Sequence, residues 1–112
     1  MIFIIDDDEV MAECIARYCG KNKTKVFSNA IEAMNAIDDE KPDLIFLDIL
    51  LDGPDGFTFL NELASYGDTA KIPIVIVSSL DLKNRDLTEY GVIGIIHKDT
   101  MLPEDIKQYV NR

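Results

Sequence analysis

Charged and hydroxyl side chains follow the apolar runs of this sequence, at the point where each run ends. A turn that only connects two elements favours Gly, Asn or Pro, whereas these positions hold three carboxylates, two hydroxyls and an ammonium group. The residues are Asp6, Asp7, Asp48, Ser78, Ser79 and Lys98. If the fold brings them to one place, this combination indicates a chemical site.

The carboxylates of Asp6, Asp7 and Asp48 would repel one another in such a site. At a separation of roughly 5 Å and an effective dielectric constant of roughly 20, the repulsion is about 3 kcal/mol per pair. Either some carboxyls are protonated or a cation lies between them. Carboxylate and carbonyl oxygens, without thiols or a cluster of histidines, select a hard cation such as Mg²⁺, which keeps several water ligands.

A metal site with open positions can also accept a phosphoryl oxygen. The Lys98 ammonium can pair with a phosphoryl group, and the Ser78 hydroxyl can donate a hydrogen bond to it. One carboxylate can then attack phosphorus while the others hold the metal. Asp48 is the natural nucleophile, so the residues predict phosphorylation of an aspartate.

Four apolar runs do not alternate with polar residues, which is typical of parallel strands buried on both faces. They cover residues 2–5, 44–47, 74–77 and 92–96. Residues 25–27 predict a weaker fifth strand nearer an edge of the sheet.

Helical patterns separate these strands. We expect helices over 9–19, from Asn29 to before Pro42, from Asp55 toward Gly67, over 82–90, and from Pro103 onward. Their expected end signals include Gly20, an Asn29–Glu32 capping box, Asp55 as a cap and Pro103 in a first turn. The apolar stripe over 82–90 is poor, so that helix should be short or mobile.

Strict alternation of strands and helices predicts an α/β fold, a doubly wound parallel sheet of five strands with helices on both faces. In such sheets ligands bind at the carboxyl ends of the strands. The six polar residues lie at those ends. With 112 residues, we expect a single domain.

Composition argues against several classes of protein. Eleven Lys and Arg face 21 Asp and Glu, a net charge of −10, so direct binding to nucleic acid is not expected. The sequence holds no stretch of eighteen apolar residues and no signal peptide, so a membrane is not expected either. The spacing of Cys14 and Cys19 fits no metal site, and two unpaired thiols favour a reducing cytoplasm.

Four segments together resemble the receiver domain of bacterial two-component response regulators. They are IIDDDE, PDLIFLDILLDGPDGF, IPIVIVSS and GVIGIIHK, in family order and at family-like spacing. The resemblance implies the flavodoxin-like fold of the single-domain chemotaxis regulator, with strand order 2-1-3-4-5. Residues 1–112 would be one receiver domain, with no output domain in this chain.

The resemblance also implies a metal site. Asp7 and Asp48 would bind Mg²⁺ directly, with Mn²⁺ as an alternative, together with the backbone carbonyl of Leu50. Asp6 would act on the metal through water.

The remaining roles concern the phosphoryl group and the response to it. Asp48 would be the phosphoacceptor, Lys98 would pair with the phosphate, and Ser78 with its neighbour Ser79 would bind phosphate oxygens. Ser78 would also be the switch hydroxyl, and Ile95 occupies the place of the usual switch aromatic.

The sequence departs from the family in several places. Ile95 replaces that aromatic, Asp99 replaces the proline that often follows the lysine, and Asp52 replaces the proline of the loop after the acceptor. Leu50 and Leu80 stand where rapidly dephosphorylating members often carry polar side chains that orient the attacking water. Two leucines should exclude that water, so we predict a long-lived phosphorylated state.

The implied partners are a sensor histidine kinase or a phosphotransfer protein, and a downstream protein target or an output domain outside this chain. The surface over residues 82–90, 92–96 and the last helix would also allow a homodimer. The chain would be a signalling phosphoacceptor that assists its own phosphorylation and dephosphorylation, and not an enzyme.

Two alternatives stay open. Asp6 and Asp8 match the start of a haloacid-dehalogenase-type phosphatase, as nucleophile and general acid, but that family needs a later acidic motif and leaves Asp48 without a role. The other alternative is a receiver-like binding module not controlled by phosphorylation. Ile95 and Asp99 favour it, and the complete set of polar residues opposes it.

Overall fold

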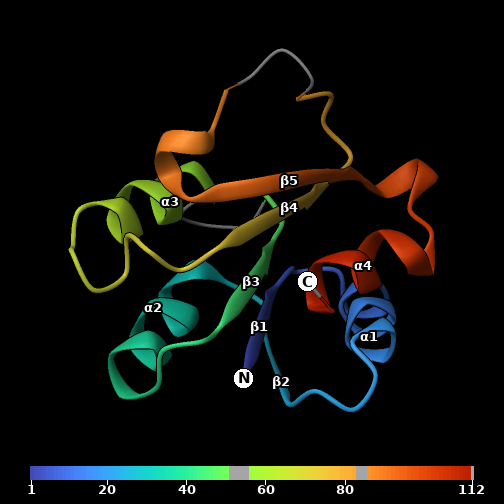
Figure 1. The fold of residues 1–112 in the computed structure, drawn as a ribbon, viewed down its shortest axis with the longest axis horizontal. Coiled ribbons are helices and arrows are strands. Elements are labelled where there is room, and N and C mark those ends of the chain that lie inside the picture. The colour runs from blue at the N-terminus through green and yellow to red at the C-terminus, as the bar shows by residue number, and fades with distance from the viewer. Residues whose placement is uncertain (51–55, 83–85, 112) are drawn as a thin grey trace.

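The computed structural model describes residues 1–50, 56–82 and 86–111. Five strands form one parallel sheet in the order β2-β1-β3-β4-β5 (Figure 1). The strands are β1 (Ile2–Ile5), β2 (Thr24–Phe27), β3 (Leu44–Leu47), β4 (Ile74–Ser78) and β5 (Val92–His97). The predicted fold class and strand order are therefore confirmed.

Burial explains why the apolar runs form the central strands. Every residue of β1, β3 and β4 is buried, as expected for strands covered on both faces. β2, which was predicted to be weaker, lies at one edge of the sheet and is partly exposed. β5 forms the other edge.

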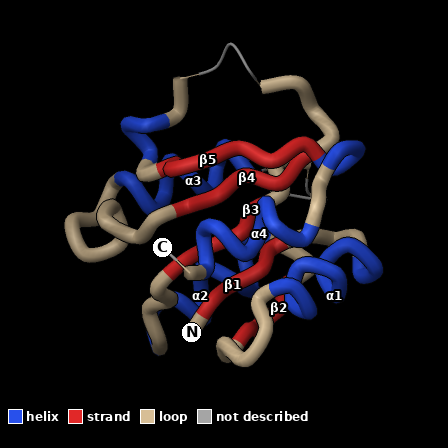
Figure 2. The backbone as a smooth tube through the Cα atoms, turned by 45° about the vertical axis from the view of Figure 1, so that its right-hand side comes forward, coloured by secondary structure: helices blue, strands red, loops and turns tan. Residues whose placement is uncertain are grey.

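Four α-helices cover the two faces of the sheet (Figures 1 and 2). They are α1 (Glu9–Tyr18), α2 (Ala30–Asp39), α3 (Gly56–Ala64) and α4 (Pro103–Val110). One apolar core lies between the sheet and α2 with α3, and the second lies between the sheet and α1 with α4. None of the helices in the described parts of the chain is long and apolar enough to cross a membrane.

The ends of the helices follow local sequence signals. Asp8 Oδ1 accepts hydrogen bonds from the N–H groups of Val10 and Met11 at the start of α1. Asn29 Oδ1 accepts from the Glu32 N–H at 2.9 Å at the start of α2. Gly20 follows α1 with a positive φ of 66°, a conformation that glycine adopts without strain.

Two further end signals were predicted for α3 and α4. Pro103 is the first residue of α4, as predicted. The expected cap of α3, Asp55, lies outside the described residues, and α3 is described from Gly56 onward.

The helix expected over residues 82–90 is wrong for the part that the structure describes. There, only Thr88–Tyr90 is helical, as a single 3-10 turn named η1. Leu82 and Leu87 are both buried, but five residues apart they would lie on different faces of an α-helix. Burial of both leucines therefore does not fit one apolar stripe of a helix over these residues.

Candidate functional site

Asp6 and Asp48 are brought together by neighbouring strands. β1 pairs with β3 so that Ile5 lies opposite Leu47, and each aspartate directly follows its strand. The backbone N–H of Asp48 donates to the Ile5 carbonyl at 2.9 Å, and the Asp6 N–H donates to the Phe27 carbonyl at 3.0 Å. Both carboxylates are buried, with exposed fractions of 2% for Asp6 and 4% for Asp48.

Lys98 reaches these two carboxylates from the far edge of the sheet. It begins η2 (Lys98–Thr100), the 3-10 turn that follows β5. Its ammonium nitrogen lies 2.9 Å from Asp6 Oδ2 and 2.9 Å from Asp48 Oδ2, and the contact with Asp48 is a hydrogen bond. One ammonium group therefore bridges two buried carboxylates that follow β1 and β3.

Asp7 completes a cluster of three carboxylates. One oxygen of each of Asp6, Asp7 and Asp48 lies within 4.8 Å of the others. Asp7 is exposed, whereas Asp6 Oδ2 is buried and accepts no hydrogen bond, its described contact being the Lys98 ammonium. Three carboxylates without a thiol or imidazole fit a hard divalent cation.

Burial and charge shift the proton affinities within this cluster. Burial raises the pKa of the Asp6 carboxyl, although a hydrogen bond from the Asp8 N–H and the nearby Lys98 ammonium act in the opposite direction. Burial alone would lower the pKa of Lys98, but the hydrogen bond to Asp48 and the contact with Asp6 together raise it. Lys98 is therefore charged at neutral pH, and Asp6 is the carboxylate whose charged form is destabilised by burial.

The predicted hydroxyl groups differ in their environment. Ser78, the last residue of β4, is 1% exposed, and its Oγ accepts a hydrogen bond from the Leu80 N–H at 3.2 Å. Ser79 is exposed. At Asp48, the predicted phosphoacceptor, the Leu50 N–H donates to Oδ1 at 3.0 Å. Backbone turns thus hold Ser78 and Asp48 in similar ways at the ends of neighbouring strands.

Two of the residues where this sequence departs from the family pattern lie in β5 and in the turn that follows it. Ile95 is 38% exposed in β5 and pairs with Ile76 of β4. The Asp99 N–H donates to His97 Nδ1 at 3.2 Å, which caps η2. Asp52 lies outside the described residues.

Gly56 is a residue that the sequence did not single out. A Cβ added there would lie 2.6 Å from the Ile49 Cα and 2.8 Å from the Asp48 carbonyl oxygen. The Gly56 N–H also donates to the Ile49 carbonyl at 3.0 Å. Only glycine lets α3 begin this close to the backbone that carries Asp48. A glycine in the first turn of a predicted helix, where glycine has a low helix propensity, was the available signal.

The chain is similar to a known protein family and to solved structures. A family model described as the response regulator receiver domain matches residues 2–111. The chain is 35% identical over 103 residues to the transcriptional regulatory protein RstA of Escherichia coli (strain K12), a match that covers 88% of this chain and 42% of RstA. The matches span 35% to 42% of the length of such curated relatives.

Solved structures show the same fold. The BeF3-activated N-terminal receiver domain of Klebsiella pneumoniae RstA has a TM-score of 0.79 and 32% identity, over 98% of this chain and 94% of that chain. The receiver domain of NtrX from Brucella abortus has a TM-score of 0.86 and 24% identity, over 100% of this chain and 96% of that chain.

Proposed function

This chain belongs to the response regulator receiver domain family, and on that premise we propose that Asp48 accepts a phosphoryl group from the phosphohistidine of a sensor histidine kinase or a phosphotransfer protein. The observation that carries the proposal is the Lys98 ammonium, 2.9 Å from both Asp48 and Asp6. A cation held on this carboxylate is already in place to neutralise charge that arrives with the phosphoryl group.

The proposed transfer is a displacement at phosphorus. An Asp48 carboxylate oxygen forms the new P–O bond, the P–N bond to the donor imidazole breaks, and its electron pair returns to the ring nitrogen, which is protonated from solvent. Lys98 then pairs with the phosphoryl oxygens, and the Ser78 hydroxyl donates to one of them once it is released from the Leu80 N–H. Ser79 is the second proposed phosphate ligand.

The family binds divalent metal, and we propose Mg²⁺ here, with Mn²⁺ as an alternative. Asp7 and Asp48 would bind it directly with the Leu50 carbonyl, and Asp6 through water. The bound ion supplies charge neutralisation at the transferred group. The three carboxylates within 4.8 Å and the buried Asp6 Oδ2 without a hydrogen bond support this choice.

We further propose that the phosphorylated state is long-lived. Leu50 and Leu80 flank the site from two different loops and are 50% and 37% exposed. Neither side chain can orient a water molecule for attack on phosphorus. This proposal rests on the two leucines and is independent of the identity of the kinase.

The output would be a change in protein contacts, in the cytoplasm, with a downstream target or with an output domain outside these residues. Receiver domains are signalling domains and are generally not classed as enzymes, and we propose that this one assists its own phosphorylation and dephosphorylation. A homodimer through residues 82–90, β5 and α4 stays a prediction. Among the described residues of 82–90 only the 3-10 turn η1 is helical, and each copy carries a net charge of −10.

The geometry weighs against the phosphatase alternative. Its proposed general acid, Asp8, is engaged as the N-terminal cap of α1 through two backbone N–H groups. Asp8 is thus already used to hold the first turn of α1. Only a chemical test can distinguish the binding-module alternative from the proposed phosphotransfer.

That test is incubation of the purified chain with acetyl phosphate, followed by intact-mass measurement. We expect a gain of one phosphoryl group with Mg²⁺ and no gain when the metal is chelated. Asp48→Asn should abolish the gain. Asp39→Asn, which removes an exposed carboxylate at the end of α2, is the matched control and should label like the unmodified protein. Absence of labelling in the unmodified chain would favour the binding module.

A further inference from the structure

β2 forms one edge of the sheet, at the opposite side from β5 (Figure 1). Its neighbour β1 bonds to the carbonyl groups of Lys23 and Phe27, which accept from backbone N–H groups at 2.9 Å and 3.0 Å. Because the backbone groups of a strand point to its two sides in alternation, Lys25 also faces β1, whereas Thr24 and Val26 face outward. The turns and caps of the described residues supply no partner for these outward groups. Two N–H and two C=O groups are thus open to pairing with a further strand.

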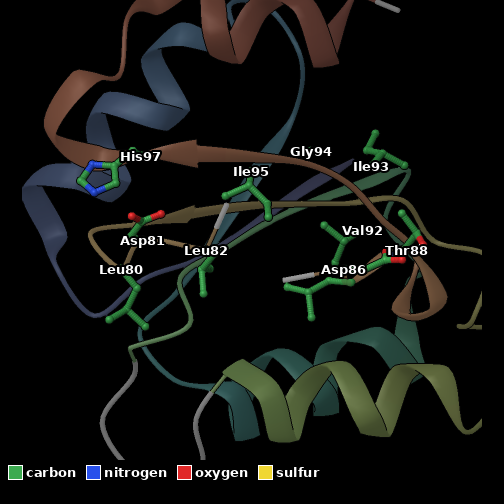
Figure 3. A pocket seen from close by; sticks show the side chains of 11 residues that line it. Leu80, Asp81, Leu82, Asp86, Thr88, Val92, Ile93, Gly94, Ile95 and His97 are labelled. Atoms are coloured by element: carbon green, nitrogen blue, oxygen red, sulfur yellow. Dashed lines mark hydrogen bonds between the residues drawn. The ribbon is translucent and has the colours of Figure 1, made fainter. Parts of the chain in front are cut away.

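The β2 edge is also the basic part of an acidic molecule. Residues 14–31 contain four Lys and Arg and no Asp or Glu, whereas the whole chain has a net charge of −10. Arg17, Lys21 and Lys23 are exposed, and no ion pair joins them to a carboxylate in the described parts of the chain. The strand at the other edge, β5, carries mainly apolar side chains (Figure 3) and no lysine. Positive charge is therefore concentrated beside the open side of β2.

The two faces of β2 differ in chemistry. Phe27 packs against the core between the sheet and α2 with α3. Alternation places Lys25, and Lys23 two residues before it, on that same face, and Lys25 Nζ lies 3.5 Å from Glu40 Oε1 at the end of α2. Val26 lies on the other face and is 49% exposed. A strand added to this edge would meet lysines on one face and an exposed valine on the other.

The lysines decide which kind of strand fits. Two copies of β2 side by side would bring like charges together, which is unfavourable, so a second copy of this chain is a poor occupant. A strand with carboxylates opposite the lysines is complementary to them. β2 has four residues, which at about 3.3 Å per residue extend over about 13 Å. The matching segment is therefore short, acidic and extended.

We propose that the open edge of β2 binds an extended, acidic segment of a partner protein as an added strand of the sheet. The segment has Asp or Glu at alternate positions, opposite Lys23 and Lys25, and apolar residues between them, opposite Val26. Backbone hydrogen bonds to Thr24 and Val26 supply the affinity, and the side-chain pairs supply the selectivity. This surface goes beyond the proposed phosphotransfer. Its test uses no phosphodonor, so failure of Asp48 to be labelled would leave it unaffected.

The test is fluorescence anisotropy at low salt with the full chain and three labelled synthetic peptides of about seven residues. The first alternates Glu and Val, the second has Lys in place of each Glu, and the third has the composition of the first with the Glu residues grouped at one end. We expect the first to bind. The second should bind at least about tenfold more weakly because like charges face each other, and the third several-fold more weakly. Absence of binding by the first peptide would show that the lysines only protect the edge.

N-methylated peptides separate strand addition from attraction between charges alone. In an added strand, only every second N–H of the peptide points toward β2. Two versions of the first peptide carry N-methyl groups, one at the odd and one at the even positions. We expect one version to lose at least about tenfold in affinity and the other to bind like the unmodified peptide. Equal binding of the two versions would contradict pairing through the backbone.

Amide hydrogen exchange, followed by NMR, locates the pairing on the protein. When about nine-tenths of the chain is bound, exchange of the Thr24 and Val26 N–H groups should slow about tenfold, because only the unbound chain exposes them. The Lys25 N–H already faces β1 and should change less. Protection of N–H groups in β5, without protection of Thr24 and Val26, would place the peptide at the other edge of the sheet.

Matched substitutions test the side chains of this edge. Lys23→Gln should weaken binding of the first peptide about two- to fivefold, whereas Lys71→Gln, at an exposed lysine between α3 and β4, should leave it unchanged. Val26→Gln should also weaken it about two- to fivefold through lost apolar contact, unlike Ile31→Gln, at a 58% exposed isoleucine of α2 in a groove toward α3. Full binding by both Lys23→Gln and Val26→Gln would refute the proposal. If a variant fails to fold, the N-methylated peptides still test the unmodified chain.

Discussion

At the scale of single residues, Lys98 holds the unphosphorylated site together. Without its ammonium, Asp6 and Asp48 would be two buried carboxylates that repel each other, and burial already raises the pKa of Asp6. The ion pairs with Lys98 compensate only part of that cost. Under the proposed function, the same cluster would bind a cation and a phosphoryl group at the expense of its own stability.

Asp6→Asn should stabilise the metal-free chain. Asn keeps the oxygen that accepts from the Asp8 N–H and removes a buried charge. Because the pKa of Asp6 is raised on folding, the unmodified protein loses stability as pH rises from the usual aspartate pKa of 3.8 through the higher pKa of the folded state. The variant lacks that loss, so we expect it to be more stable at neutral pH by about 1 kcal/mol, measured by urea unfolding with a chelator present.

The control for this prediction is Asp39→Asn, which removes a charge from an exposed position. It should change the free energy of unfolding by less than about 0.5 kcal/mol. If Asp6→Asn were instead less stable than the unmodified protein at neutral pH, its attraction to Lys98 would outweigh its burial cost.

Leu50→Gln should shorten the life of the phosphorylated state. A polar side chain at this half-exposed position can orient a water molecule toward phosphorus. Because an amide does not take the proton, its effect should stay below the roughly hundredfold at which general-base catalysis begins. We expect the decay rate, followed by intact mass after the donor is removed, to rise several-fold. Ile31→Gln is the control. Equal decay of the unmodified protein and Leu50→Gln would show that water access is not limited at this position.

At the scale of elements, the start of α3 controls the position of Asp48. Gly56→Ala forces a Cβ against the backbone of Ile49 and Asp48, which cannot move as a side chain can. We expect a loss of about 2–3 kcal/mol in the free energy of unfolding, together with slower labelling by acetyl phosphate.

Gly67→Ala is the matched control for this substitution. A Cβ added at Gly67 meets no atom within 4 Å, and its φ is not positive. We therefore expect a change of less than about 1 kcal/mol, of either sign. Similar effects of the two substitutions would refute the role of close packing at Gly56.

The elements also show how far the sequence alone could lead. β1 and β3 have the predicted bounds because uninterrupted apolar runs leave no other way to bury both faces. The residues at the strand ends followed from the rule that parallel strands share a carboxyl edge. Of the helix expected at 82–90, the described residues form only the 3-10 turn η1, since burial of Leu82 and Leu87 in the tertiary structure overrode a helical pattern of weak amphipathicity.

Other features depend on geometry that a linear sequence does not carry. The sequence assigned Lys98 to a phosphoryl group but gave no sign of its contact with Asp6, which requires the order of the strands and the reach of the side chain past β4.

At the scale of the whole molecule, a net charge of −10 and three clustered carboxylates make the stability depend on cations. A divalent ion at a hundred times its dissociation constant should raise the free energy of unfolding by about 2.7 kcal/mol. Urea unfolding with Mg²⁺ and with a chelator measures the difference. The free energy of unfolding of Asp48→Asn should rise clearly less on addition of Mg²⁺. An equal gain with KCl at the same ionic strength would reveal general screening of the acidic surface in place of a site.

The whole account depends on which residue receives the phosphoryl group. The most direct measurement is peptide mapping by mass spectrometry after incubation with acetyl phosphate and Mg²⁺. We predict a single phosphoryl group, on Asp48. A phosphoryl group on Asp6 would support the phosphatase alternative, and modification at any residue other than Asp48 would contradict the site assigned here.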